Sequence, residues 1–248
     1  MPILCVIPAR LHASRLPHKP LCLLGGEPLV RAVARRALEA EVADLVVVAT
    51  DHPHVADAVA DLPVDAVLTD RSHGSGTERV AELAARPEYA WADIIVNVQG
   101  DEPFFPPEGA RLATEMVSGI WPIATVGAPL IPAMLTDENR VKVVVDGHGR
   151  ALRFSRLLPA SGAWRCDVRV LHHVGLYAYT RQALARWAAA PMPPEEREQR
   201  LEQLRPLHLG IAIGVAGLPE PVHPGVDTAH DLSEAQRVLD ALSERAYR

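Results

Sequence analysis

Cysteine is scarce in this chain of 248 residues: Cys5, Cys22 and Cys166 lie far apart, without a CxxC pair. This spacing provides neither a disulfide framework nor a zinc site, and it predicts buried apolar thiols in a reducing, cytoplasmic compartment. The sequence also lacks an apolar run long enough to span a bilayer, and its N-terminus begins directly with a strand pattern rather than a cleavable signal. We therefore expect no membrane partner.

The chain has no general excess of positive charge. Its formal net charge is -6 and its pI is about 6.0, which argues against nucleic acid or an acidic membrane as a partner. However, no acidic residue precedes Glu27, and one loop collects the cations Arg10, Arg15 and Lys19 together with His12 and His18. A local basic cluster of this kind predicts a small anionic partner.

The hydrophobic pattern predicts an α/β fold. The first half alternates short β-branched runs with amphipathic segments, which is typical of a mostly parallel, Rossmann-like sheet with helices on both faces. The second half contains a hairpin pattern over 141–155, a strand over 172–180 and a helix over 193–205 with a charged outer face. We therefore expect one domain over 1–248 with a hairpin-rich insertion at about 130–210.

The basic loop follows the first strand, at the carboxyl edge where open α/β sheets bind ligands. It matches neither GxGxxG nor GxxxxGK[ST], which weakens a dehydrogenase or P-loop reading. Arg10, Arg15 and Lys19 are suited to hold a polyphosphate, because a guanidinium bonds two phosphate oxygens and a lysine adds a point charge. The alternative is a solvated loop whose cations pair with acids elsewhere.

Two aspartates also follow strands, Asp101 in NVQGDEP and Asp227 in GVDT. Converging on one sheet edge, they would suit Mg²⁺, which binds through one or two carboxylates plus substrate phosphates. Each alone is more typical of a cap or turn, and we interpret Glu102 as a turn residue.

A glycine-containing loop precedes a helix in SHGSGTERVAE, residues 72–82. Thr77 is a plausible N-cap. Alternatively, the small residues let the backbone approach a base edge closely. The residues alone do not separate these two interpretations.

Taken together, these stretches resemble one family. The chain contains, in the family's order, IPARLHASRLPHKPL, ATDH, HGSGTERVAE, NVQGDEP, VKVVVD, FSR, HHVGLYAYT, LEQLR and GVDT. This resembles the 3-deoxy-manno-octulosonate cytidylyltransferases, or CMP-Kdo synthetases, over essentially residues 3 to 240.

The resemblance implies a nucleotidyltransferase that moves CMP from CTP to the anomeric hydroxyl of 3-deoxy-D-manno-octulosonate (Kdo) and releases pyrophosphate. It implies a homodimer and a role in lipopolysaccharide biosynthesis. It assigns catalysis to Arg10, Lys19, Asp101 and Asp227, and Mg²⁺ to the two aspartates. It assigns CTP binding to Pro8, Ala9, Arg10, Arg15, Lys19, Ser75, Gly76, Thr77 and Arg79.

The resemblance assigns the acidic sugar to Gln99, Arg156, His173, Tyr177, Glu202 and Gln203. By itself, Tyr177 is more typical of core packing, Glu202 of a solvated helix face and His173 of a satisfied polar residue. Two departures lie on this side: His172 replaces a basic residue, so anion binding would fade as pH rises, and the segment 157–164 lacks the acidic, aromatic pattern of the family.

Other functions stay open at this point. A cytidylyltransferase for 8-amino-Kdo or a nonulosonate, or a sugar-phosphate nucleotidyltransferase, would share the fold. A non-catalytic CTP-binding subunit is disfavoured because Lys19, Asp101 and Asp227 are all retained. A glycosyltransferase is disfavoured because QGDEP lacks DxD spacing.

Overall fold

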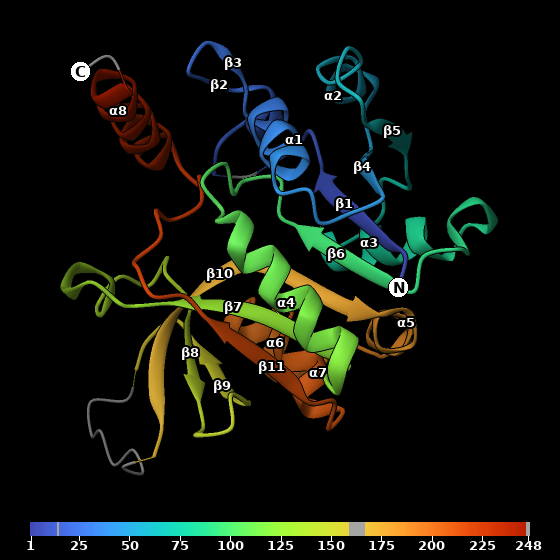
Figure 1. The fold of residues 1–248 in the computed structure, drawn as a ribbon, viewed down its shortest axis with the longest axis vertical. Coiled ribbons are helices and arrows are strands. Elements are labelled where there is room, and N and C mark those ends of the chain that lie inside the picture. Colours follow the sequence, from blue (N-terminus) through green and yellow to red (C-terminus); the bar gives the residue numbers. More distant parts are fainter. Residues whose placement is uncertain (14, 159–166, 247–248) are drawn as a thin grey trace.

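The structure, a computed structural model, describes residues 1–13, 15–158 and 167–246. Among them, nine strands form one twisted sheet whose main path runs β11-β7-β10-β6-β1-β4-β5 (Figure 1). The pairs β1/β4, β1/β6, β4/β5 and β7/β11 are parallel, and β10 is antiparallel to both of its neighbours. The strands of the main path are β1 (Ile3–Ala9), β4 (Leu45–Thr50), β5 (Asp65–Leu68), β6 (Ile94–Val98), β7 (Ile123–Ala128), β10 (Arg169–Thr180) and β11 (Ile213–Gly217).

The predicted mostly parallel sheet is therefore confirmed, and so is the hairpin. Strands β8 (Lys142–Val145) and β9 (Ala151–Ser155) pair antiparallel around the turn at Gly149, whose φ is +82°. Strand β8 also pairs with the first part of β10, which extends beyond the central sheet to meet it. A separate two-stranded ribbon joins β2 (Leu23–Leu24) to β3 (Glu27–Pro28).

Helices cover both faces of the sheet (Figure 1). One face packs against α1 (Leu29–Glu39), α2 (Pro53–Asp57) and α4 (Pro107–Gly119). The other packs against α3 (Gly76–Ala85), α5 (Arg181–Ala189) and α7 (Leu204–His208). The remaining helices are α6 (Pro194–Gln199), α8 (Ala229–Ala246) and the short 3-10 turns Lys19–Leu21, Pro87–Tyr89 and Pro132–Met134.

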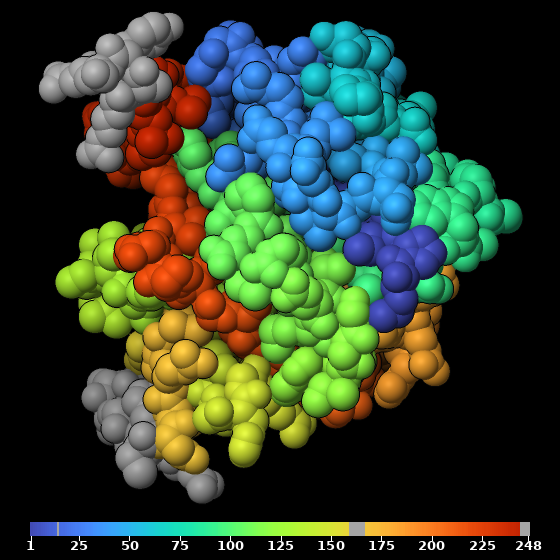
Figure 2. Space-filling view, viewed as in Figure 1, coloured from blue at the N-terminus to red at the C-terminus, as the bar shows by residue number. Residues whose placement is uncertain are grey.

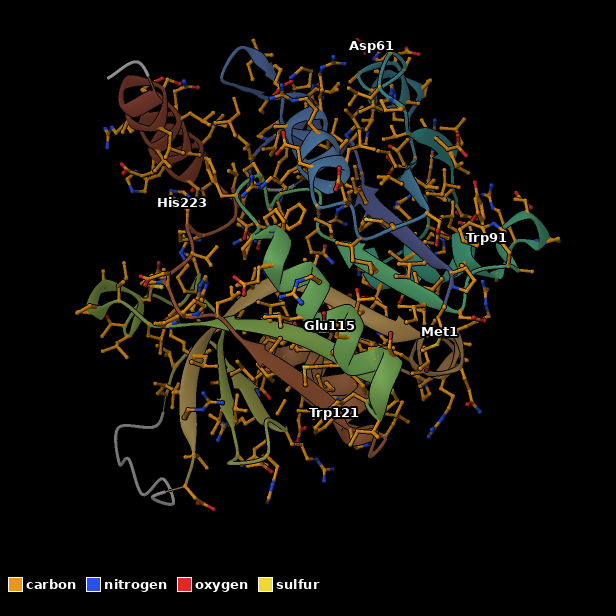
Figure 3. The ribbon with its side chains drawn as sticks, viewed as in Figure 1. Met1, Asp61, Trp91, Glu115, Trp121 and His223 are labelled. Carbon is orange, nitrogen blue, oxygen red and sulfur yellow. The ribbon has the colours of Figure 1, made fainter. Side chains whose placement is uncertain are left out.

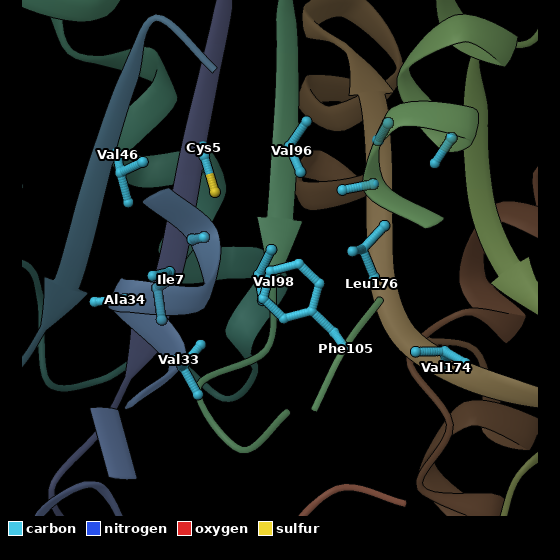
Figure 4. Packing of buried hydrophobic residues seen from close by; sticks show 14 of the residues in the cluster. Cys5, Ile7, Val33, Ala34, Val46, Val96, Val98, Phe105, Val174 and Leu176 are labelled. Atoms are coloured by element: carbon cyan, nitrogen blue, oxygen red, sulfur yellow. The ribbon is translucent and has the colours of Figure 1, made fainter. Parts of the chain in front are cut away.

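The apolar strands explain this layering. In β1, Leu4 and Val6 point into one core while Cys5 and Ile7 point into the other, and none is more than 4% exposed. Figure 4 shows Cys5 and Ile7 among side chains from α1 and the neighbouring strands. Full burial of such a side chain contributes roughly 1.5–3 kcal/mol, so a strand buried on both faces is mostly apolar. The buried thiol predicted for Cys5 is confirmed; Cys22 is partly exposed, and Cys166 lies outside the described residues.

The helix predicted over 193–205 is wrong. The chain breaks into α6 and α7 at Arg200, whose φ of 53° is left-handed and incompatible with a continuing helix. Its expected charged outer face is also partly buried: Glu196 is 3% exposed and accepts two hydrogen bonds from Arg205, at 2.6 and 2.8 Å. A buried bidentate pair replaces the solvated face because each charge offsets the desolvation of the other. No helix in the described part of the chain is long and apolar enough to cross a membrane.

Candidate active site

The loops after β1 and β6 meet because these two strands are parallel neighbours in the sheet. They line a cavity of about 260 Å³ together with the loop before α3 and Asp227 from the chain before α8. Gly100 makes this approach possible, since a Cβ there would lie 2.7 Å from the carbonyl oxygen of Pro8. Members of the predicted sites that line the cavity are Pro8, Ala9, Arg10, Arg15, Lys19, Ser75, Gly76, Arg79, Gln99, Asp101 and Asp227.

The centre of the cavity wall is a cation between two carboxylates. Nζ of Lys19 lies 2.5 Å from Oδ2 of Asp101 and 3.1 Å from Oδ1 of Asp227. Burial disfavours the charged ammonium, but the two aspartates outweigh it and raise the pKa of Lys19 above its usual value. Lys19 is therefore charged at neutral pH. It pairs with acids elsewhere in the chain, as the alternative for this loop expects, but its side chain is only 17% exposed and so is not solvated.

The donor set fits a divalent cation that arrives with a phosphate ligand. Asp101 and Asp227 supply hard carboxylate oxygens at one point, and the ammonium of Lys19 stands in there for a cation. In the described part of the chain, no group of three histidine, cysteine or acidic side chains is placed to hold a metal. Two carboxylates are what Mg²⁺ takes from a protein when substrate phosphates complete its shell.

The two arginines of the basic loop are more exposed than Lys19. Nη2 of Arg15 lies 3.0 Å from Oδ1 of Asp227, and the Arg15 side chain is 48% exposed. Arg10 is exposed at the carboxyl end of β1, directly after the buried Pro8 and Ala9. Both guanidinium groups therefore lie on the rim of the cavity, where they can bind an anion with little loss of existing contacts.

The loop before α3 approaches the other wall. Ser75, not Thr77, is the N-cap, because the Ser75 hydroxyl accepts from the backbone N–H of Glu78 at 3.2 Å. The cap predicted at Thr77 is thus wrong by two residues. Gly76 contacts the opposite wall, since a Cβ there would lie 3.0 Å from Oε1 of Gln99. Arg79 is 2% exposed and donates to Thr69 and, at 3.5 Å, to Asp51, which holds its guanidinium beside the cavity.

Of the predicted sugar-binding set, only Gln99 is among the residues that line the cavity. Arg156 interacts electrostatically with Arg15 and Asp227, which line it. The Arg156 guanidinium donates to the carbonyls of Gln199, Glu138 and Arg200, at 3.1 to 3.4 Å. Burial, followed by the nearby positive charge of Arg15, lowers the pKa of Arg156 from its usual value. An arginine destabilised in its charged form beside a second cation is suited to receive a carboxylate.

The other four residues of that set lie in the interior. His173 is 9% exposed, with Nε2 3.0 Å from the Thr125 hydroxyl, and burial lowers its pKa to about 3. Tyr177 is 2% exposed and stacks on Tyr179, with ring centroids 5.7 Å apart. Gln203 is also buried. None of these four side chains lines the cavity, and their sugar-binding roles stay predictions.

Glu202 is not on a solvated face. Burial raises the pKa of its carboxyl, an effect that the hydroxyls of Ser75 and Thr77 partly offset. The Glu202 carboxyl therefore lies next to Ser75 and Thr77, at the start of α3.

The pH-dependent anion binding predicted for His172 is wrong. Its side chain is 5% exposed, and burial, with Arg140 and Lys142 nearby, lowers its pKa to about 4. A neutral, buried imidazole does not replace a basic residue. The second departure, in 157–164, falls largely outside the described residues.

The sequence reasoning missed several cavity residues: Ala13, Pro20, His73, Gly74 and Gly100. The glycines could have been inferred from the need for close backbone approach at strand ends. It also missed the contact of Asp231 with the loop that carries Asp227, although T-x-x-D fits the capping-box pattern [ST]-x-x-[DE].

The chain is similar to known proteins over nearly its whole length. A family model described as cytidylyltransferase matches residues 4–213. A 3-deoxy-manno-octulosonate cytidylyltransferase of Gemmatimonas aurantiaca is 49% identical over all of this chain and 99% of its own length. One of Methylococcus capsulatus is 45% identical over 94% of this chain and 95% of its own.

The chain belongs to the 3-deoxy-manno-octulosonate cytidylyltransferase family. A solved CMP:2-keto-3-deoxy-manno-octonic acid synthetase complexed with CTP superimposes with a TM-score of 0.86 at 36% identity, covering 97% of this chain and 99% of its own. A putative glucose-1-phosphate thymidylyltransferase from Bacillus anthracis, 15% identical with a TM-score of 0.65, shares the fold over 95% of this chain and 94% of its own. The expected nucleotidyltransferase fold and enzyme class are therefore confirmed.

Proposed function

We propose that this enzyme transfers CMP from CTP to the anomeric hydroxyl of Kdo and releases pyrophosphate, with Mg²⁺ as cofactor. The observation that carries the proposal is the convergence of Arg15, Lys19, Asp101 and Asp227 on one cavity. The loop after β1 supplies the cations that would bind the triphosphate, and the loops that carry Asp101 and Asp227 supply the carboxylates that would bind the metal. Cations and carboxylates lie within ion-pair distance of each other. A relative named 3-deoxy-manno-octulosonate cytidylyltransferase spans the whole chain, and a solved CMP:2-keto-3-deoxy-manno-octonic acid synthetase complexed with CTP spans 97% of it.

In this reaction the hydroxyl oxygen forms a bond to the α-phosphorus and the hydroxyl proton passes to solvent. The bond from the α-phosphorus to the oxygen that bridges to the β-phosphate breaks, and pyrophosphate leaves. Asp101 and Asp227 would hold Mg²⁺, which supplies charge neutralisation at the phosphates. Arg10, Arg15 and Lys19 bind the phosphate oxygens, and Lys19 offsets the charge that develops on pyrophosphate. The chain thus acts mainly by positioning and charge stabilisation.

The remaining assignments belong to the same proposal. Pro8, Ala9, Ser75, Gly76, Thr77 and Arg79 are proposed to bind the nucleoside, and Gln99, Arg156, His173, Tyr177, Glu202 and Gln203 the sugar. We propose one nucleotidyltransferase domain over 1–248, in which the insertion at about 130–210 binds the sugar and contacts the second subunit of a homodimer. We propose that the enzyme acts in the cytoplasm. The product would enter lipopolysaccharide biosynthesis.

Pyrophosphate release from CTP tests the proposal. Kdo, 8-amino-Kdo and N-acetylneuraminate are each supplied with Mg²⁺, with and without a chelator. We expect release with Kdo that stops on chelation. Release with another sugar acid alone would move the substrate assignment and keep the nucleotide site. CTP binding without release from any sugar would favour the non-catalytic CTP-binding alternative.

A further inference from the structure

The loop that carries Asp227 is held from behind by the carboxylate of Asp231, a residue 6% exposed at the start of α8. Oδ2 of Asp231 accepts from the backbone N–H of Asp227 at 3.1 Å and from the N–H and hydroxyl of Thr228, both at 2.8 Å. Its Oδ1 lies 2.5 Å from Nη2 of Arg140. One buried carboxylate therefore joins the backbone of a proposed metal ligand to an arginine distant in sequence.

A helix cap accounts for only part of this arrangement. The reciprocal bond from Asp231 N–H to the Thr228 hydroxyl, at 3.2 Å, completes a capping box for α8. The cap needs neither the bond to Asp227 nor Arg140, which comes from the segment before β8. In the space-filling view, the yellow-green segment around 130–140 lies against the orange-red chain that leads to α8 (Figure 2). His223, labelled in Figure 3, belongs to that chain.

Arg140 also reaches the loop directly. Its side chain is 14% exposed; Nη1 donates to the Gly225 carbonyl at 3.5 Å, and Nε lies 3.3 Å from Asp137. Between these anchors, the N–H of Val226 donates to the carbonyl of Asp101 at 2.8 Å. Three consecutive residues, 225 to 227, are thus tied to Arg140, Asp101 and Asp231 in turn. These ties set where the Asp227 carboxylate stands relative to Asp101.

We infer that Arg140 is a positioning residue for the metal site, acting through Asp231 and the Gly225 carbonyl to hold Asp227 opposite Asp101. The inference rests on the proposed function, since it assumes that the two aspartates bind a divalent cation. Partners that orient metal ligands typically contribute tenfold to a hundredfold in metal affinity.

The test is Mn²⁺ binding to the full chain without nucleotide, followed by electron paramagnetic resonance. In Arg140→Gln, we expect the dissociation constant for Mn²⁺ to rise at least about tenfold. The matched control is Arg181→Gln, because Arg181 also holds backbone carbonyls, those of Ala84, Tyr89 and Ala92, but far from the cavity. The control should lower the melting temperature and leave the Mn²⁺ constant unchanged. An unchanged constant in Arg140→Gln, or an equal rise in the control, would overturn the inference.

Two further variants keep the outcome decisive. Arg140→Lys retains the charge, but one ammonium replaces the guanidinium fork. Its dissociation constant for Mn²⁺ should therefore lie between those of the wild type and Arg140→Gln. If circular dichroism shows that Arg140→Gln is unfolded, Arg140→Lys takes its place in the test. Asp227→Asn should remove the Mn²⁺ site. If it does not, the metal assignment itself fails. If it does while both Arg140 variants bind normally, only the positioning role is wrong.

Discussion

The side-chain nitrogen of Lys19 lies 2.5 Å from Oδ2 of Asp101, in the place where we propose that a divalent cation binds. Without nucleotide, a metal ion must therefore displace a charged ammonium from two carboxylates. Bound phosphates would attract Lys19 and free both carboxylates. Metal and CTP should accordingly bind best together.

Lys19→Met tests this competition. Removing the ammonium should tighten Mn²⁺ binding to the nucleotide-free enzyme about tenfold, roughly 1.4 kcal/mol, while turnover falls by about a hundredfold or more. Mn²⁺ titration and pyrophosphate release measure the two effects separately. Arg35→Met, at a surface ion pair with Glu27, is the control. Unchanged or weaker Mn²⁺ binding in Lys19→Met would contradict the proposal that the Lys19 ammonium occupies the place of the metal ion.

Replacing either proposed metal ligand should stop the reaction without unfolding the chain. Asp101 and Asp227 have side chains 26% and 28% exposed, so Asp→Asn costs little packing. We expect turnover to fall by at least about a hundredfold with a nearly unchanged melting temperature. The control is Asp61→Asn, which removes a 71% exposed partner of Arg31 and should change neither turnover nor the melting temperature. Near-normal turnover in both site variants would remove the metal from this position.

Arg156 should act on the sugar and not on CTP. We expect Arg156→Ala to raise KM for the sugar at least about tenfold while KM for CTP stays the same, as measured by pyrophosphate release. Because Arg156 also holds three backbone carbonyls, Arg156→Lys is the companion variant. Equal changes in both KM values would exclude Arg156 from the sugar site.

The buried histidine His172 should make stability depend on pH. Its pKa is about 4 when folded and about 6.5 when exposed, so the unfolded chain binds more protons between these values. The stability contribution is then full above about pH 6.5 and is lost as pH falls toward 4, and its size is on the order of 3 kcal/mol.

Urea unfolding at pH 7 and pH 5 measures this effect. His172→Gln should lose part of the difference between the two pH values, although His173, with a folded pKa of about 3, retains its own share. The exposed His54→Gln is the control. The same pH dependence in His172→Gln and wild type would contradict a neutral buried imidazole.

The strands and loops around the site could be predicted from the local pattern of apolar and polar residues. The apolar run of β1 and the alternation of strands with helices predict a parallel sheet, because a strand covered on both faces is stabilised by apolar side chains on both of them. Strand polarity then places the basic loop and Asp101 on one edge, and Asp227 follows β11 there. The side of the site that we propose to bind nucleotide was predictable to this extent.

Tertiary structure alone decided the rest, because burial depends on what packs against a residue and not on its own neighbours in sequence. Glu196 belongs to a charged helix pattern, yet it is buried and paired with Arg205. His172 sits beside two cations that no local pattern places there. Arg140 and Asp231 are 91 residues apart, and only the fold brings them together behind Asp227. The sequence by itself determined which chemical groups meet at the sheet edge; the fold decided their charge states and which residues hold them in place.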